Sequence, residues 1–480
     1  MKFLEKIIQY GILLLVFLIP WQARWIISGG EINGGPWEYG TQSLYATEIL
    51  LALILVLLII RFFVEAAAAR RLGEKKKTPQ RGRLYKSIGV LFLIYAGISV
   101  FWAIDKNVAL IHWRWLVEAG ILMALVRLEG SRNTNAPIRM AIIISAAIQA
   151  MWGIGQFLMQ SIPASTILGI AQQSADVLGA SVVETMDGRW LRAYGSFPHP
   201  NMLGGWLVLG LVVIIRKIQE TRYKQIQISN IQLLFLYASF IVILFGLLAT
   251  FSRSAWLAFG VFTIFWFIKE MSKCHSGLDP ESRSKNKNWI PAFAGMTLIV
   301  AVVSIFIAIF PQPFLTRLNN TSRLEYKSTS ERQASLSEGW QIIKKHPLLG
   351  VGVGNYGLAV HRDIDSTQPA YYYQPVHNVF LLIWAELGLI GLLFILLIVF
   401  LSLRPRSSGG SNPDNALNIV SSKGDIQRDG RIAAVAGTLP RNDMIFVLPL
   451  IVILLFDHYP WSLYSGLMIS ALYLANISRK

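Results

Sequence analysis

The stretch LYATEILLALILVLLIIRFF, residues 44–63, decides the fold class of this chain. Every residue between Glu48 and Arg61 is apolar. An α-helix rises about 1.5 Å per residue, so about 20 residues of this kind cross the hydrocarbon core of a bilayer. The stretch therefore predicts a transmembrane helix.

Apolar runs of similar length recur along the whole chain of 480 residues. Charged residues make up 15% of the sequence, against about 25% in soluble globular proteins. We predict an all-α integral membrane protein with about twelve transmembrane helices. The predicted spans are residues 7–25, 44–63, 87–103, 108–126, 139–159, 200–215, 231–250, 254–268, 290–311, 377–400, 444–457 and 461–476.

Lysine and arginine are concentrated in alternate loops. Cytoplasmic loops carry an excess of these residues in membrane proteins, so the basic loops predict that both termini are cytoplasmic. The formal net charge of +17 is then mainly a topology signal, and we expect no nucleic-acid partner. The basic loops are residues 61–86, 127–132, 216–224, 269–289 and 401–443.

Two long loops, residues 160–200 and 312–376, then fall on the external side. Loops of such length are usually functional or disordered. In the second loop, Ser328 and Glu331 fit a capping box, and apolar residues follow at helical spacing. We predict a partly helical outer loop between the ninth and tenth spans, with an amphipathic helix over residues 330–346.

The long outer loop divides the chain into residues 1–311, with the first nine spans, and residues 377–480, with the last three. A cytoplasmic loop, 269–289, interrupts the first part, and a linker rich in Ser, Gly, Asn and Asp, 401–443, interrupts the second. Residues 274–297 resemble a short repeat peptide translated inside unrelated bacterial proteins, so we interpret them as an insertion without a catalytic role.

Ionisable residues gather at the predicted outer ends of the helices. They are Arg192, Arg253, Arg332 and His377, and they come from separate segments. Taken singly, an arginine at a helix end is more often an interfacial anchor, and a lone histidine is more often structural. Intramembrane and interfacial charges concentrated on one face favour a functional site there.

At these residues the chain resembles the O-antigen ligase and O-antigen polymerase superfamily of bacterial membrane glycan ligases, polymerases and O-oligosaccharyltransferases. The matching segments lie in the order of the family. They are RAYGSFPHPNMLGGWL (192–207), TFSRSAWLAF (250–259), ERQASLSEGWQIIKKHPLLGVGVGNY (331–356) and HNVFLLIWAELGLIGLL (377–393).

The resemblance implies a helical membrane glycosyltransferase-like fold in the bacterial cytoplasmic (inner) membrane. It also implies a function in lipopolysaccharide or other cell-surface polysaccharide biosynthesis. The donor would be a glycan linked to undecaprenyl pyrophosphate, and the acceptor a hydroxyl of a glycolipid, glycan or glycoprotein. No cofactor is implied.

The resemblance also assigns roles to residues. Arg192, Arg253 and Arg332 match the arginines assigned to the donor pyrophosphate, and His377 matches the histidine assigned to the acceptor. We take His377 and Arg332 as the catalytic residues. Asn201 and Asn378 are the expected supporting residues.

The chemistry of these side chains agrees with such roles. Guanidinium groups bind phosphate through two parallel hydrogen bonds, and donors aimed at developing charge accelerate a reaction. Histidine, with an unperturbed pKa near ~6.5, can remove the proton of a hydroxyl. Because arginines already supply positive charge at the phosphates, we expect no metal.

Two other motifs compete with this interpretation. Asp363, Asp365 and His361 could bind a divalent cation, although carboxylates on a polar loop are more often solvated. The glycine-rich segment LGVGVGNYG (349–357) has the composition of a phosphate-binding loop, but it lacks the Walker lysine. We interpret it as a tight turn.

Three classes of function stay open. Among glycosyltransferases we rank a ligase first, before a polymerase or a protein O-oligosaccharyltransferase. A transporter or lipid-glycan flippase would need a polar path through the membrane, and His112, Arg114 and Glu118 are too few to form one. The third class is a non-catalytic membrane assembly subunit.

Overall fold

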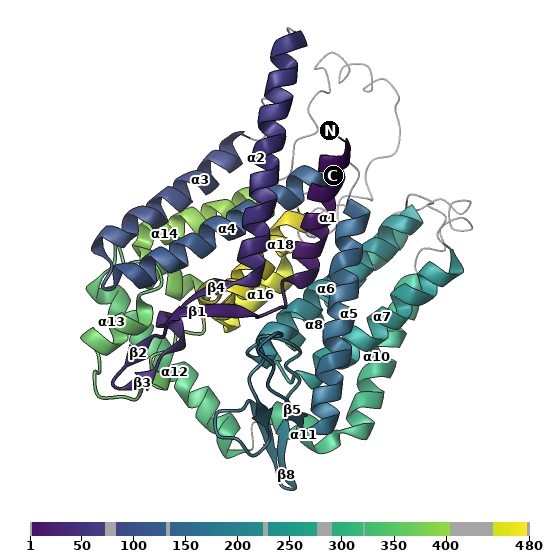
Figure 1. Cartoon of the computed structure of the whole chain (residues 1–480). Coiled ribbons are helices and arrows are strands. Elements are labelled where there is room, and N and C mark those ends of the chain that lie inside the picture. Colours follow the sequence, from purple (N-terminus) through teal and green to yellow (C-terminus); the bar gives the residue numbers. More distant parts are fainter. Residues whose placement is uncertain are drawn as a thin grey trace, which may run out of the picture.

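The computed structural model describes residues 2–72, 83–130, 135–223, 229–275, 290–319, 322–403 and 445–477. Over these ranges the chain is mostly helical. Figure 1 shows the helices in one bundle, with short strand pairs gathered at one end. We call this the hairpin end. Most of the predicted loop 269–289 and of the linker 401–443 lies outside the described residues.

The long helices follow the apolar runs of the sequence. Their bounds are α1 (Lys2–Leu18), α2 (Ala46–Leu72), α3 (Arg83–Ile98), α4 (Lys106–Gly130), α5 (Asn135–Met159), α6 (Pro200–Tyr223), α7 (Asn230–Ala249), α8 (Arg253–His275), α10 (Ile290–Ile309), α12 (Arg323–Lys345) and α14 (Val379–Leu403). The shorter helices are α11 (Pro311–Asn319), α13 (Tyr356–Asp363), α16 (Leu448–Phe456), α17 (Tyr459–Ser462) and α18 (Tyr464–Ile477).

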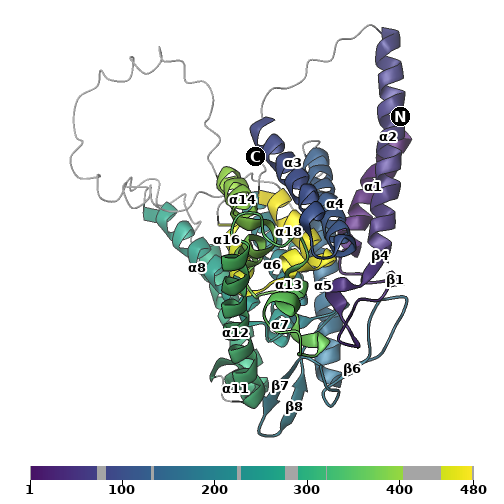
Figure 2. The ribbon, with the colours of Figure 1, turned by 90° about the vertical axis from the view of Figure 1, so that its left-hand side faces the viewer.

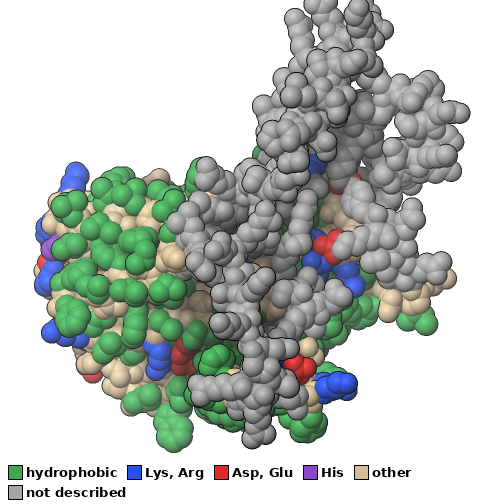
Figure 3. Space-filling view, turned by 90° about the horizontal axis from the view of Figure 1, so that it is seen from above, with side chains coloured by type: hydrophobic (Ala, Val, Ile, Leu, Met, Phe, Trp, Pro, Cys, Tyr) green, Lys and Arg blue, Asp and Glu red, His purple; other side chains and the backbone are tan. Residues whose placement is uncertain are grey.

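Seven helices of the described residues are long and apolar enough to cross a membrane. They lie in α2, α4, α5, α6, α7, α8 and α14. The remaining predicted spans fall on helices such as α16, which has only 9 residues, so twelve spans stay a prediction. Seen from the end opposite the hairpins, the part of the surface formed by described residues and not covered by others is largely hydrophobic, with scattered charged side chains (Figure 3).

Helix α6 lies at the centre of the bundle, and 89% of its membrane-spanning window is buried. Small residues let its neighbours approach closely. A Cβ on Gly210 would lie 2.7 Å from the Cβ of Ala146 on α5, and one on Gly204 would lie 2.8 Å from that of Ala255 on α8. Because close packing through small residues fixes helix pairs in membranes, the first turn of α6 is held firmly at the hairpin end.

The described residues are mostly helical, which is consistent with the predicted all-α class, but the hairpin end also contains short antiparallel strand pairs that the sequence analysis did not predict. The pairs are β1 (Arg24–Ser28) with β4 (Gln42–Tyr45), β2 (Glu31–Ile32) with β3 (Gly35–Pro36), β5 (Ser161–Ile162) with β6 (Gln173–Ser174), and β7 (Val182–Thr185) with β8 (Gly188–Leu191). Each strand has only two to five residues. Strands this short do not show the alternation of apolar and polar residues by which a strand is recognised in a sequence. In Figure 2, α11 and α12 lie beside β7 and β8.

The predicted amphipathic helix is present as α12, but it begins earlier than expected, at Arg323. Ser322 caps it, because its hydroxyl accepts a hydrogen bond from the amide of Glu325. Ser322 and Glu325 have the same spacing as the Ser328 and Glu331 of the predicted cap. The earlier start matters because it brings Glu325 into the helix and into contact with the site described below.

Helix α14 is interrupted at Gly388, whose φ of 67° lies in the left-handed region. The glycine-rich segment fills this break. The amides of Val351 and Gly352 donate to the carbonyls of Ala385 and Glu386 at 3.0 and 2.8 Å, and the amide of Leu389 donates to Pro347 at 2.9 Å. Its amides thus bind the helix, which agrees with a tight turn and not with a phosphate-binding loop.

Candidate active site

His377 lies in the link that immediately precedes α14. Its neighbour Asn378 fixes this position. The Asn378 side chain accepts a hydrogen bond from the amide of Leu381 at 3.1 Å and donates one to the carbonyl of Leu455 at 3.2 Å. Asn378 therefore caps α14 and joins its start to the end of α16, which holds the backbone of His377.

The side chain of His377 is partly buried. Its Nδ1 atom is buried and has no hydrogen-bond partner among the described residues. Its ring centroid lies 4.8 Å from that of His458, with the two rings nearly perpendicular. Burial, and then the positive charge of Arg332, lower the pKa of His377 to about 4. The ring is therefore neutral near pH 7 and has a lone pair that can accept a proton.

His458 and Asp457 lie beside His377, in the link between α16 and α17. One nitrogen or oxygen atom from each of the three side chains falls within 4.8 Å of the others. Asp457 is 3% exposed, and its Oδ2 accepts hydrogen bonds from Asn201 at 2.8 Å and Ser254 at 3.3 Å. Neither Asp457 nor His458 was among the predicted site residues.

Arg192 lies between β8 and the first turn of α6, and it is 5% exposed. Its Nε donates to the carbonyl of Thr250 at 2.7 Å, and an NH2 group donates to Oδ1 of Asn201 at 2.7 Å. Burial, followed by the charge of Arg317, lowers its pKa well below the usual value. Arg192 thus joins three segments of the site, and Asn201 links it to Asp457.

Arg253 begins α8, directly after a turn in which Phe251 has a φ of 48°. Its guanidinium lies 3.4 Å from the carboxylate of Glu325. Arg317 of α11 pairs with the same carboxylate and donates to the carbonyl of Phe251 at 2.8 Å. Two cations therefore share one buried carboxylate, which leaves the cluster with an excess of positive charge.

Arg332 lies on α12, and its charge is close enough to lower the pKa values of Arg192, His377 and His458. Unlike Arg253 and Arg317, it forms no ion pair with a carboxylate of the described residues. Its guanidinium can therefore bind an anion without first leaving a protein partner.

The structure thus brings together all the predicted arginines, His377 and Asn201. It adds Arg317, Asp457 and His458, which sequence reasoning missed. The signal for the last two was present, because the sequence FDHYPW (456–461) lies in a very short link between two predicted spans, on the same predicted side as His377. Arg317 has no comparable signal, since it follows an ordinary helix end.

The competing acidic motif does not converge on one point. Asp363 pairs with Arg362 at 2.7 Å and lies 3.2 Å from His346. Asp365 accepts hydrogen bonds from Thr367 and Gln368, and these bonds lower its pKa to about 2. Each carboxylate therefore has its own local partners.

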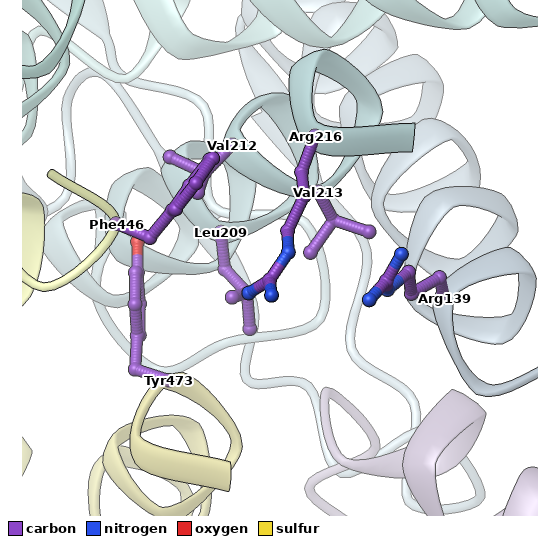
Figure 4. A pocket seen from close by; sticks show the side chains of 7 residues that line it. All are labelled: Arg139, Leu209, Val212, Val213, Arg216, Phe446 and Tyr473. Carbon is purple, nitrogen blue, oxygen red and sulfur yellow. The ribbon is translucent and has the colours of Figure 1, made fainter. Parts of the chain in front are cut away.

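A small pocket is lined by none of these cluster residues; Figure 4 shows its lining. Arg139 and Arg216 point into it, and its other lining residues are mainly apolar. Arg216 lies roughly 22 Å along α6 from Asn201, at 1.5 Å per residue. With a volume of ≈ 10 Å³, about that of one water molecule, the pocket has no room for a glycan.

Comparison with known proteins connects these residues to a family. Residues 238–396 match the model of a family described as O-antigen ligase. Over this segment, the chain is similar to the O-antigen ligase family. A stretch of 179 residues is 28% identical to the O-antigen ligase of Salmonella typhimurium (strain LT2), and it covers 34% of this chain and 38% of that protein. The match thus spans less than half of the relative.

The O-antigen ligase segment includes Arg253, Arg317, Arg332 and His377. Arg192 and Asn201 precede it, and Asp457 and His458 follow it. The candidate site therefore combines the matched segment with both flanking parts of the chain.

Proposed function

We propose that this chain is a membrane glycosyltransferase that moves a glycan from a polyprenyl pyrophosphate, undecaprenyl pyrophosphate in bacteria, to an acceptor hydroxyl. Two features of the site support the proposal best. Arg332 has no carboxylate partner among the described residues, and its charge acts on the nearby imidazole of His377, which is partly buried and neutral near pH 7. The match of residues 238–396 to the O-antigen ligase family model supports the same class of reaction.

The donor pyrophosphate would bind to Arg332 and Arg253, with Arg317 and Arg192 behind them. Pyrophosphate gains negative charge as its bond to the sugar breaks, so fixed cations stabilise the transition state more than the ground state. The partly apolar surroundings strengthen this attraction. No metal is required in this scheme, because the guanidinium groups carry the positive charge.

The acceptor would approach His377. Its hydroxyl oxygen attacks the anomeric carbon while its proton passes to the imidazole, and the glycosidic bond to the pyrophosphate breaks. The lipid pyrophosphate leaves with the bonding electron pair. A single displacement of this kind inverts the anomeric centre. Asn378 would position His377, and Asn201 would hold Arg192 and Asp457 at fixed distances.

Among glycosyltransferases we rank an O-antigen ligase-like enzyme first, with a polymerase or a protein O-oligosaccharyltransferase as alternatives. A transporter or flippase is less well supported. Arg114 pairs with Glu48 at 2.9 Å and with Glu118 at 3.6 Å, so these charged residues form a local ion-pair group and not a polar path.

We further propose that the chain lies in the bacterial cytoplasmic (inner) membrane, with the hairpin end outside and both termini in the cytoplasm. Single cysteines at Ser335 and Ser366, in a variant without Cys274, should react with an impermeant thiol reagent added outside. Cysteines at Ser131 and Ser408 should react only after the cytoplasmic side is opened. Labelling of Ser335 from the cytoplasm alone would reverse the orientation and exclude an external reaction.

The function is tested by transfer with the purified chain. A lipid-pyrophosphate glycan is mixed with lipid A-core, with a growing glycan or with a protein acceptor, and the products are weighed by mass spectrometry. We expect one glycan to be joined to one acceptor class, at the same rate in a chelating agent. Transfer that is lost in chelator and restored by magnesium or manganese would contradict the metal-free scheme. If no acceptor yields a product, the proposal that the chain is a glycosyltransferase is contradicted.

A further inference from the structure

We propose that His377, Asp457 and His458 form a binding site for a transition-metal ion of the zinc type, and that metal bound there blocks transfer. The second half rests on the proposed function, because it requires His377 to be the base. The first half does not. Within the described residues, these three side chains are the group whose geometry suits a metal ion.

The ligand set has the composition that zinc prefers. Zinc is commonly bound by two imidazoles and one carboxylate, with its fourth coordination position left open. The three ligand atoms lie within 4.8 Å of one another, whereas tetrahedral bonds of 2.0–2.2 Å require roughly 3.3 Å. Small rotations of the imidazoles would close that difference.

Each ligand atom is available. The Nδ1 of His458 lies 2.7 Å from the hydroxyl of Ser462, which orients the ring and leaves Nε2 for a metal, as neighbouring hydrogen bonds do in known sites. His377 has a buried Nδ1 without a hydrogen-bond partner in the described part of the chain. Such orphaned atoms are rare in proteins and call for an explanation.

Asp457 supplies the charge. It is buried, and no lysine or arginine of the described residues forms an ion pair with it; its partners are the amide of Asn201, the hydroxyl of Ser254 and the backbone of His458. A buried carboxylate held only by neutral donors is costly unless a cation joins it. Arg332 acts on the three side chains from a distance, so its charge opposes a metal and sets an upper limit on affinity.

A bound zinc ion would occupy a nitrogen lone pair of His377 and hold the ring away from the acceptor. The reaction would stop without any change to the donor-binding arginines. The site would therefore act as an inhibitory site for soft divalent ions, and magnesium, which prefers oxygen ligands and octahedral geometry, would not replace zinc there.

Zinc binding is measured first, without any substrate, by competition between the purified chain and a chromophoric zinc chelator. We expect one strong site in the wild type. His458→Ala and Asp457→Asn should each weaken it by about tenfold or more, since loss of even an indirect partner costs about 10–100-fold. Arg332→Gln should tighten it. His361→Ala, which removes a histidine bonded to Asn33 at 3.1 Å, is the matched control and should bind as the wild type does.

Inhibition is measured separately, by adding zinc and then an excess of chelator to the transfer reaction. Inhibition that is reversed by chelator and weakened in His458→Ala supports the proposal. Equal zinc affinity in the wild type, His458→Ala and Asp457→Asn overturns the site, whatever the chain catalyses. Tight zinc binding at these residues without inhibition supports the zinc site but contradicts the inhibitory role and the assignment of His377 as the general base. Activation by zinc would overturn the inhibitory role.

Discussion

Replacing His377 with alanine should lower the rate of glycan transfer by about 10²–10⁴-fold, the usual contribution of a general base, and leave donor affinity nearly unchanged. The reason is that the imidazole acts on the acceptor hydroxyl, whereas the donor phosphates are held by guanidinium groups elsewhere. Transfer rate and lipid-pyrophosphate affinity are measured separately on each purified variant, after its thermal unfolding has been compared with that of the wild type.

His361→Ala is the control for this prediction, because it removes a histidine on α13 without touching the cluster. His377→Asn keeps a polar side chain and serves if the alanine variant is unstable. A His377→Ala variant that transfers at the wild-type rate would disprove the base assignment. One that loses donor affinity instead would move His377 into the phosphate site.

Replacing Arg332 with lysine should weaken donor binding and slow transfer, together by roughly 10- to 100-fold, which corresponds to one lost charged hydrogen bond. Lysine keeps the charge but loses the planar pair of donors that fits a phosphate. Because the Arg332 side chain has no described carboxylate partner, its replacement should leave the stability of the chain unchanged. Donor affinity, transfer rate and unfolding temperature are the three measurements.

Arg323→Lys is the matched control, since Arg323 lies on the same helix and its side chain is 78% exposed. Arg192 offers a contrast. Its guanidinium already binds Thr250 and Asn201, so Arg192→Lys should lower the unfolding temperature as well as the rate. Unchanged donor affinity in Arg332→Lys would leave Arg332 as an interfacial anchor and remove it from the phosphate site.

The membrane class and the position of most helices could be predicted from the sequence, because a long apolar run has few alternatives to a helix. The short strands could not, since pairs of two to five residues carry no clear alternation. The start of α12 was misplaced for a specific reason. Two serine–glutamate pairs of equal spacing lie in succession, and only packing against Arg317 and Arg253 selects the first.

The site was predicted in part. The predicted topology places Arg192, Arg253, Arg332 and His377 on one side of the membrane, and in the structure they lie in one cluster. The sequence does not give the distances between side chains that lie on different helices. That Glu325 is shared by two arginines, or that His458 lies against His377, depends on how α11, α12 and α16 pack, and no local pattern encodes such packing. The roles of these residues in catalysis stay predictions.

The break in α14 has a consequence for how the site meets the lipid. The segment before Gly388 is bonded to the glycine-rich loop at Ala385 and Glu386, and Leu389 directly after the break is bonded to Pro347. The longer part of the helix beyond Leu389 is apolar and makes none of these bonds. Transmembrane helices adjust to bilayers of different thickness by tilting. The break at Gly388 allows the apolar part of α14 to tilt while the first part keeps its position. A change in membrane thickness should therefore leave the position of His377, at the start of the helix, unchanged.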